Sequence, residues 1–268
     1  MMFFYSLEHL FESGIYTGFS IAALAVLGSL MVSSPYGRFA SASYGVEMDP
    51  RWGWFFMELM ATVSFIYFYI QGPLATRPVS LIFAGLYLIH YANRGFYFPF
   101  NIRVHKGSNS SFSWLVIVSG IIVTSLHGYL NAQWYSRFAE FLDWDWMCSP
   151  TCIVGLVLYE VGFWATIRCE YIMRHLRDGD SDSNSFTPAA RYKIPRGFLF
   201  EYVSSPQYFT ELIAFFGWAV MTWNPAGAVI FCISAANLVP RAVQTQAWYK
   251  NKFDNYPPER KILIPFLW

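Results

Sequence analysis

The sequence predicts an all-α integral membrane protein with seven transmembrane helices, and three of its properties lead to that class. Only 13% of the 268 residues are charged and 55% are hydrophobic, whereas soluble domains carry about 25% charged residues. The mean hydropathy is positive, at +0.33. Apolar runs long enough to cross a bilayer as a helix, about 20 residues each, also recur between charged connections. The chain 1–268 is therefore predicted to fold as a single membrane-embedded domain.

The seven predicted spans begin and end at charged or turn-forming residues. They are 13–32, 52–71, 79–98, 112–130, 150–170, 208–223 and 226–247. The first run has neither a basic segment before it nor a clear cleavage site after it, so we expect a retained helix rather than a removed signal peptide. Only Asn224 and Pro225 separate the last two runs. Because proline favours the first turn of a helix, this pair predicts a tight helical hairpin.

The basic residues predict the orientation of the chain. Most of the 18 Lys and Arg residues fall on the connections of one side, whereas the other side receives only Arg77 and Arg137. The positive-inside rule then places the N-terminus outside, or in the lumen, and the C-terminus in the cytoplasm. The membrane is expected to be that of the endoplasmic reticulum in a eukaryote and the cytoplasmic membrane in a bacterium.

Several functional classes are disfavoured by what the sequence lacks. The formal net charge of +1 gives no reason to expect a nucleic acid partner. The chain has no GxGxxG, Walker, GxSxG or HExxH motif, so Rossmann, P-loop, hydrolase and zinc-protease sites are not expected. No second His or Cys stands at ligand spacing from His90, so no metal site is expected. The absence of internal repeats disfavours a transporter.

A few polar side chains fall inside the predicted spans, where they are costly and often functional. Tyr91 and Arg94 share a helix face, as do Asn237 and Arg241. A phenol, a guanidinium and a carboxylic acid kept neutral by burial can together polarise an enone. The same groups can also serve only to link helices, so both interpretations stay open. The other candidates are Glu58, His90, Glu160 and Glu211.

Ordered motifs cover the chain almost from end to end. They are HYANRGFYFPF at 90–100, EYIMRHLR at 170–177, YKIPRGFLFEYVSSPQYFTEL at 192–212 and NLVPRAVQTQAWYKNKFDNYPPERKILIPFLW at 237–268, together with Glu58 in the triplet MEL. In this order they resemble the steroid 5-alpha-reductase family. The resemblance implies a reductase domain with seven helices and the N-terminus outside. It also implies a substrate cavity mainly from the early helices and a cofactor site mainly from about 160–260.

The resemblance further implies NADPH-dependent reduction of the 4,5 double bond of a 3-oxo-4-ene steroid, with hydride added to the beta carbon. Tyr91 and a protonated Glu58 match the family positions that hold the 3-oxo oxygen. The expected partners are therefore a hydrophobic enone and membrane lipid. The positions that match family cofactor contacts are Arg94, Thr166, Glu170, Arg177, Tyr192, Gln207, Glu211, Asn237, Arg241 and Tyr249.

Four residues depart from the family pattern. Met57 stands beside Glu58 where the animal steroid enzymes have a glutamine, which alters one contact to the substrate carbonyl. Thr245 and Gln246 occupy a stretch that often holds histidine, and Thr166 stands where asparagine is frequent. These departures leave the substrate, the proton donor to the alpha carbon and single cofactor contacts open.

Three other functions are weighed against this one. Another membrane enoyl reductase, acting on a polyprenol precursor or a very-long-chain enoyl thioester, would share the fold and the cofactor. A membrane methyltransferase is disfavoured because methyl transfer needs no enolate stabiliser such as Tyr91 and Glu58. A small channel or transporter would instead line a path with Glu58, Arg94 and Glu160. The oligomeric state is not predicted.

Overall fold

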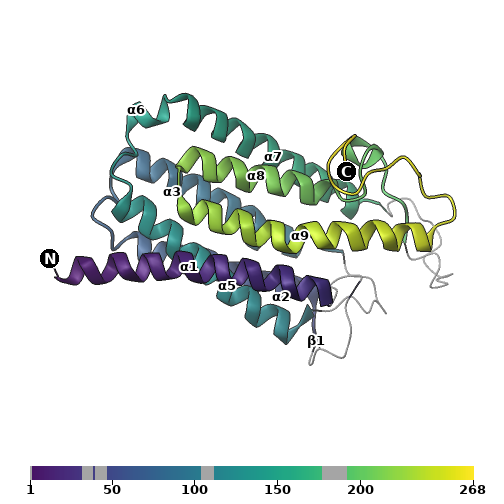
Figure 1. The fold of residues 1–268 in the computed structure, drawn as a ribbon, viewed down its shortest axis with the longest axis horizontal. Helices are drawn as coiled ribbons and strands as arrows, with labels where there is room; N and C mark the ends of the chain where they lie inside the picture. Colours follow the sequence, from purple (N-terminus) through teal and green to yellow (C-terminus); the bar gives the residue numbers. More distant parts are fainter. Residues whose placement is uncertain (1, 32–38, 40–46, 104–111, 177–191) are drawn as a thin grey trace.

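A computed structural model describes residues 2–31, 39, 47–103, 112–176 and 192–268, and it shows an elongated bundle of long helices (Figure 1). The long helices are α1 (Met2–Met31), α2 (Pro50–Tyr69), α3 (Pro78–Tyr91), α5 (Trp114–Gln133), α7 (Pro150–Arg174), α8 (Pro206–Thr222) and α9 (Pro225–Lys252). Consecutive long helices run in opposite directions, so the two termini lie at opposite ends of the bundle (Figure 1). The all-α prediction is confirmed.

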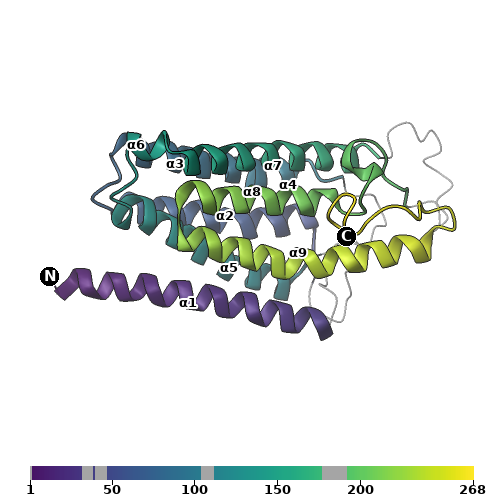
Figure 2. The same ribbon diagram turned by 45° about the horizontal axis from the view of Figure 1, so that its top comes forward.

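Short elements complete the architecture. In the described parts of the chain the strands are two residues long and pair antiparallel, β1 (Glu47–Met48) with β2 (Phe112–Ser113). The short helical segments are the π-helices η3 (Ala92–Tyr97) and η4 (Trp134–Phe138), the α-helices α4 (Phe98–Phe100) and α6 (Trp144–Met147), and the 3₁₀ helix η5 (Phe198–Glu201). We call the end of the bundle that carries α6 the α6 end. The opposite end, where α9 extends beyond the other helices (Figure 2), is the tail end.

Local sequence signals start the helices. Asp49, Ser149 and Asn224 cap α2, α7 and α9 by accepting hydrogen bonds from first-turn backbone N–H groups, and a proline follows each of them. The caps satisfy donors that a helix leaves unpaired, and proline has no N–H to lose at this position. The tight turn predicted at Asn224 and Pro225 is therefore present.

Two helices extend beyond the spans predicted for them. The first helix begins already at Met2 rather than near 13, and the last continues to Lys252 rather than ending near 247. The predictions followed hydropathy, which falls at polar residues, whereas helical hydrogen bonding continues through them. In α1 the early turns are held by Phe11, whose ring packs 4.8 Å from that of Phe138.

In the part of the chain that the structure describes, four helical segments are long and apolar enough to cross a membrane. They are Leu7–Ser29, Trp114–Phe138, Pro150–Arg174 and Pro225–Lys252. α3 has 14 residues before η3 begins, and α8 has 17, so each alone is short for a span. The four apolar helices indicate a membrane protein, and the count of seven spans stays a prediction.

Small residues bring two pairs of helices into close contact. Gly128 of α5 faces the backbone oxygen of Ala61 in α2, and Gly162 of α7 faces that of Thr210 in α8. A Cβ at these glycines would come within 2.5 and 2.6 Å of those oxygens. Small residues at such positions let membrane helices approach closely. The core between the pairs is aromatic and includes Phe65, Tyr87, Tyr135, Tyr159 and Trp218.

The two basic residues on the sparse side of the predicted topology lie at the α6 end and have local roles. Arg77 Nη1 donates to the backbone oxygen of Glu140 at 3.1 Å, and Arg137 Nη2 donates to that of Gln71 at 2.9 Å. Both bonds join the connection after α2 to the one after α5. These arginines therefore link two connecting segments. This local role accounts for two basic residues at the end of the bundle that otherwise carries few.

Candidate functional site

A π-helical segment positions the centre of the candidate site. Residues Ala92–Tyr97 form η3 directly after Tyr91, and the Phe98 N–H donates to the backbone oxygen of Asn93. Such segments are frequent at functional sites. Gly95 lies in η3 against α2, where an added Cβ would come 3.3 Å from the Cβ of Glu58. This close approach lets Arg94 face Glu58 across the two helices.

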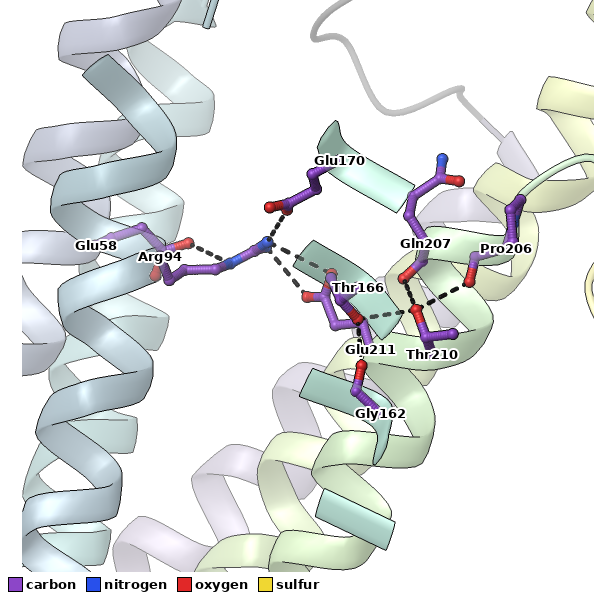
Figure 3. Close-up of polar contacts among 9 residues, drawn as sticks. All are labelled: Glu58, Arg94, Gly162, Thr166, Glu170, Pro206, Gln207, Thr210 and Glu211. Atoms are coloured by element: carbon purple, nitrogen blue, oxygen red, sulfur yellow. Dashed lines mark hydrogen bonds and ion pairs between the residues drawn. The ribbon is translucent and has the colours of Figure 1, made fainter. Parts of the chain in front are cut away.

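Three carboxyl groups surround the guanidinium of Arg94 (Figure 3). Its Nε lies 3.2 Å from Glu58 Oε1, its Nη2 lies 3.1 Å from Glu211 Oε1 and its Nη1 lies 3.9 Å from Glu170 Oε1. All four side chains are largely buried, and the most exposed of them, Arg94, reaches only 19%. The guanidinium also lies over the ring of Trp54 at 5.0 Å. We call Arg94, Glu58, Glu170 and Glu211 the Arg94 cluster.

The Arg94 cluster places three carboxyl groups around one guanidinium. A guanidinium provides five N–H donors, and among the described residues Arg94 is the only cation paired with these carboxyl groups. Each ionised carboxyl group offers about four acceptor sites, so three of them can accept more hydrogen bonds than one guanidinium donates. A ligand with its own hydrogen-bond donors, such as a carboxamide or hydroxyl groups, therefore fits beside this cluster.

Two cavities lie beside α3 and the π-helix η3 that follows it. The first is a small cavity between these helices and the α7–α8 pair, and Arg94, Glu170 and Glu211 form its polar wall. The second, also small, is bordered by Tyr91. His90 borders both cavities.

The two predicted catalytic residues, Tyr91 and Glu58, are 3% and 5% exposed. They lie on the successive helices α2 and α3. Glu58 accepts a hydrogen bond from Arg94, and the ring of Tyr91 packs 4.7 Å from that of Tyr87. The structure thus brings the pair into one buried region, with no hydrogen bond between them among the residues it describes.

Thr166 and Gln207, both predicted to contact a cofactor, have different surroundings (Figure 3). The Thr166 hydroxyl donates to the backbone oxygen of Gly162 at 2.9 Å and lies 2.8 Å from the hydroxyl of Thr210. It therefore also holds α7 against α8. Gln207 Oε1 is buried and has no hydrogen-bond partner among the described residues, so it can accept a bond from a ligand.

The remaining predicted cofactor residues lie on or near α9. Arg241 is 5% exposed, and its Nε donates to the hydroxyl of Tyr208 on α8 at 2.9 Å. Asn237 lies one turn earlier on the same helix and is half-buried. Both residues therefore lie along the helix that leads to the tail end.

Tyr192 and Tyr249 belong to an aromatic group at the tail end. The Tyr192 ring lies 4.8 Å from that of Trp248, and the Tyr249 ring stacks on Tyr256 at 5.2 Å. Arg177 lies outside the described residues. The structure thus gathers Glu58, Arg94, Thr166, Glu170 and Glu211 closely and distributes the other predicted residues toward the tail end.

Three further polar residues were missed by the sequence reasoning. Ser205 Oγ, Gln244 Oε1 and two guanidinium nitrogens of Arg260 are buried, and none has a hydrogen bond within the described part of the chain. Arg260 Nη2 lies 3.7 Å from Glu201 Oε2. All three residues fall inside the motifs at 192–212 and 237–268. The motifs alone gave no reason to single them out as candidate ligand contacts. We call Ser205, Gln207, Gln244 and Arg260 the tail-end polar group.

Glu160 and His90 differ in their relation to the site. Glu160 accepts a hydrogen bond from Trp164 Nε1 at 2.9 Å on an exposed face of α7, away from both cavities. His90 is buried among aromatic rings, and its Nδ1 lies 3.4 Å from the Tyr159 hydroxyl. Glu160 is therefore not part of the candidate site, whereas His90 forms part of its wall.

Comparison with known proteins identifies the family. A family model described as 3-oxo-5-alpha-steroid 4-dehydrogenase matches residues 110–268. The mouse protein 3-oxo-5-alpha-steroid 4-dehydrogenase 1 is 36% identical over 261 residues, which cover 96% of this chain and 97% of the mouse protein. The chain belongs to the 3-oxo-5-alpha-steroid 4-dehydrogenase family. The rat protein of the same name is 35% identical over 250 residues, 92% of this chain and 91% of its own length. The tomato protein Steroid 5-alpha-reductase DET2 is 35% identical over 238 residues, 88% of each chain.

Membership of the 3-oxo-5-alpha-steroid 4-dehydrogenase family confirms both the predicted family and the predicted class, an oxidoreductase. That class is consistent with a nicotinamide cofactor, and the tail-end polar group fits one. The unpaired oxygens of Gln207 and Gln244 can accept bonds from a carboxamide or from ribose hydroxyls. Arg260 Nε and Nη2, which make no hydrogen bond to the described residues, can donate to phosphate oxygens, for which a guanidinium is well shaped.

Proposed function

We propose that this protein uses NADPH to reduce the 4,5 double bond of a 3-oxo-4-ene steroid. The family supports the reaction class, and the names of the rat and mouse relatives specify a 3-oxo-steroid. The observation that carries the proposal is the Arg94 cluster beside Tyr91. The cluster holds the Glu58 carboxyl group through Arg94, which borders the first cavity, and the buried Tyr91 phenol borders the second.

The proposed topology has seven spans, with the N-terminus outside and the tail end in the cytoplasm. The antiparallel course of the seven long helices supports this count (Figure 1). The basic residues that follow α7 and α9 would then face the cytoplasm, as the positive-inside rule requires. NADPH is available in that compartment, on the side where the tail-end polar group lies.

The cofactor is proposed to lie between the first cavity and the tail end. Glu170, Glu211 and Gln207 would accept from its carboxamide and hydroxyl groups. Arg241, Arg260 and Arg177 would pair with its phosphates, while Asn237, Tyr192 and Tyr249 would contact the rest. Arg94 and Thr166 also line the first cavity, and they would lie on its side nearest to the substrate.

Tyr91 and Glu58 are proposed to donate hydrogen bonds to the 3-oxo oxygen of the substrate. NADPH, when bound, supplies a hydride to the beta carbon, and negative charge then builds on that oxygen. Arg94 Nε donates to Glu58 Oε1, which leaves Oε2 to carry the proton that faces the ketone. One preorganised donor in a dry site contributes about 3 kcal/mol, or about a hundredfold in rate.

The test is substrate-dependent consumption of NADPH by the purified protein, followed by the loss of NADPH absorbance. We expect consumption with a 3-oxo-4-ene steroid and none without an enone. A very-long-chain enoyl thioester and a polyprenol-type enone complete the panel. NADPH consumption with only one of these two compounds would assign the corresponding reductase function. If none of the enones causes NADPH consumption, a channel or transporter would be favoured.

Tyr91→Phe tests the proposed role of the phenol. The variant keeps the ring and loses one donor to the developing charge, so kcat should fall by about tenfold or more, while the Kd for NADPH stays within about twofold. Steady-state kinetics and a titration of NADPH fluorescence measure these values. Tyr67→Phe, at an exposed position of α2, is the matched control. Normal turnover of Tyr91→Phe would remove Tyr91 from the mechanism.

A further inference from the structure

A buried hydrogen-bond network lies next to Tyr91, and the proposed chemistry does not use it. Its centre is Asn131 on α5, which is fully buried. Asn131 Oδ1 accepts from Trp218 Nε1 at 3.1 Å, and Asn131 Nδ2 donates to the backbone oxygen of His127 at 3.0 Å. An indole N–H can only donate and a carbonyl oxygen can only accept. These two contacts therefore fix which atom of the Asn131 amide is the oxygen.

The orientation of Asn131 in turn fixes the tautomer of His127. Asn131 Nδ2 lies 3.0 Å from His127 Nδ1. An amide nitrogen only donates, so Nδ1 must accept this hydrogen bond and carries no proton. The imidazole is therefore neutral, with its one N–H on Nε2.

The Nε2–H of His127 has no protein acceptor among the residues that the structure describes. The side chain is buried, and its ring borders the second cavity. Two phenols stand nearby, with ring centroids 5.3 Å away for Tyr87 and 5.7 Å away for Tyr91. His90 and Tyr159 also border this cavity, but they lie in hydrogen-bond range of each other. The tyrosine pair is therefore the acceptor that the cavity offers to His127.

We propose that His127 is a positioning residue for Tyr91, to whose phenol oxygen it donates its Nε2–H across the second cavity. This role rests on the proposed function, because it assumes that Tyr91 bonds to the 3-oxo oxygen. A phenol oxygen that accepts one bond directs its own O–H elsewhere, and polarisation along the chain of bonds makes that O–H a stronger donor. Asn131 and His127 together would thus aim and strengthen the Tyr91 hydrogen bond.

Two substitutions of His127 separate this role from packing. His127→Gln keeps an amide N–H near the position of Nε2, since its amide lies one bond further from the backbone than that of asparagine. His127→Asn keeps an amide near Nδ1 and loses the donor toward the cavity. We expect His127→Asn to lower kcat by about tenfold with KM and the NADPH Kd within about twofold, and His127→Gln to stay within about threefold of wild type. His9→Asn, on an exposed part of α1, should match the wild type.

The Tyr91→Phe background decides which group His127 acts on. In that background His127→Asn should cause no further loss of kcat, because the hydroxyl that it positions is absent. A further loss would show that His127 acts through Tyr87 or through packing and would overturn the proposal. Equal kcat values for the two His127 variants would overturn it as well. A wild-type protein that reduces no enone would instead overturn the proposed function.

Nitrogen NMR of the wild-type protein, labelled at the ring nitrogens of its 5 histidines, tests the proposal without turnover. The His127 signal is the one lost in His127→Gln. We expect a neutral ring with the proton on Nε2, and Tyr91→Phe should shift the signal of that proton. A proton on Nδ1 in the wild-type protein would overturn the proposal, and so would a folded Tyr91→Phe variant in which the Nε2 proton signal does not shift.

Discussion

Asn131 and the tail-end polar group both bury polar atoms, but only Asn131 pairs all of them. Its Oδ1 accepts from Tyr135, Trp218 and Asn224 at 2.9 to 3.3 Å, and its Nδ2 donates to His127. In the tail-end polar group, every residue has at least one buried atom that makes no hydrogen bond to the residues described by the structure. Both regions lie within the same helical bundle, so burial alone does not explain the difference.

This difference indicates that buried polar groups have two different roles in the protein. A network that satisfies itself holds helices together, whereas unpaired donors and acceptors that gather at one end are available to a ligand. The hydroxyls of Thr62 and Ser80 are also unpaired, but they lie singly on α2 and α3. Substitutions at Asn131 should therefore act on stability, and those in the tail-end polar group should act on ligand binding. The Arg94 cluster lies between these extremes, because its charges are paired but unequal in number.

The largest effect is expected from Arg94→Met. Removing the one cation of a buried ion network leaves uncompensated carboxyl groups, so the free energy of unfolding should fall by about 3 kcal/mol or more. Thermal unfolding in a fixed detergent measures the change. Adding Glu211→Gln should recover part of the loss, because it removes one of the charges that Arg94 balances. Arg168→Met, on the exposed surface of α7, is the control, and equal unfolding temperatures for the two single variants would contradict the prediction.

Asn131→Leu should lower the free energy of unfolding by about 2 kcal/mol. The substitution keeps a similar volume but leaves the donors of Tyr135, Trp218 and Asn224 without their acceptor, and buried donors without partners are costly. The Kd for NADPH should stay within about twofold of wild type. Denaturation together with NADPH titration checks both statements. A Kd for NADPH raised well beyond twofold would contradict the prediction, because it would show that the network also shapes the cofactor site.

Gln207→Leu should show the opposite pattern. The free energy of unfolding should stay the same or rise, because a buried oxygen without a partner is removed. The Kd for NADPH should rise by about tenfold, which corresponds to about 1.4 kcal/mol for one lost hydrogen bond. The same two measurements apply, with Asn131→Leu as the comparison variant. A destabilised protein with unchanged NADPH affinity would remove the distinction between the two regions.

Most of the helical fold could be predicted because apolar runs and helix-start signals are local. The run 52–71 became α2 (Pro50–Tyr69), and Asn224 with Pro225 became the predicted turn. The π-helix at Ala92–Tyr97 could not be predicted, since hydrophobic periodicity does not mark a turn with one extra residue. That segment nevertheless decides where Arg94 points.

The candidate site was less predictable because its contacts join distant parts of the chain. The family resemblance supplied Glu58, Arg94 and Glu211 as separate positions, yet Arg94 lies 36 residues from Glu58 and 117 from Glu211 in sequence. Only folding shows that they form one cluster. The unpaired atoms of Ser205, Gln244 and Arg260 were missed for a related reason, since a side chain's lack of a partner is a property of its surroundings.

The smallest effect on stability is expected from substitutions of Asp49, a polar residue near the tail end whose carboxyl group has hydrogen-bond partners. Asp49 caps α2 and accepts from the Arg51 backbone and side chain at 2.7 to 3.0 Å. Asp49→Ala should therefore lower the free energy of unfolding by about 1 kcal/mol at neutral pH, with no change in NADPH Kd. Asp49→Asn should lose less, because asparagine caps a helix about as well.

The dependence on pH sharpens this last case. The hydrogen bond from the Arg51 side chain holds the pKa of the Asp49 carboxyl below its usual value of 3.8. A carboxyl group whose pKa is lowered by folding stabilises the protein above its unfolded pKa, and this stabilisation is lost as the pH falls through the folded pKa. The gap in unfolding temperature between wild type and Asp49→Ala should thus be constant from pH 7 to about pH 5 and narrow below 3.8. If the difference in unfolding temperature narrows already near neutral pH, a titratable group other than Asp49 is responsible. If Asp49→Ala changes the Kd for NADPH, ligand binding at the tail end does not depend only on the atoms without hydrogen-bond partners.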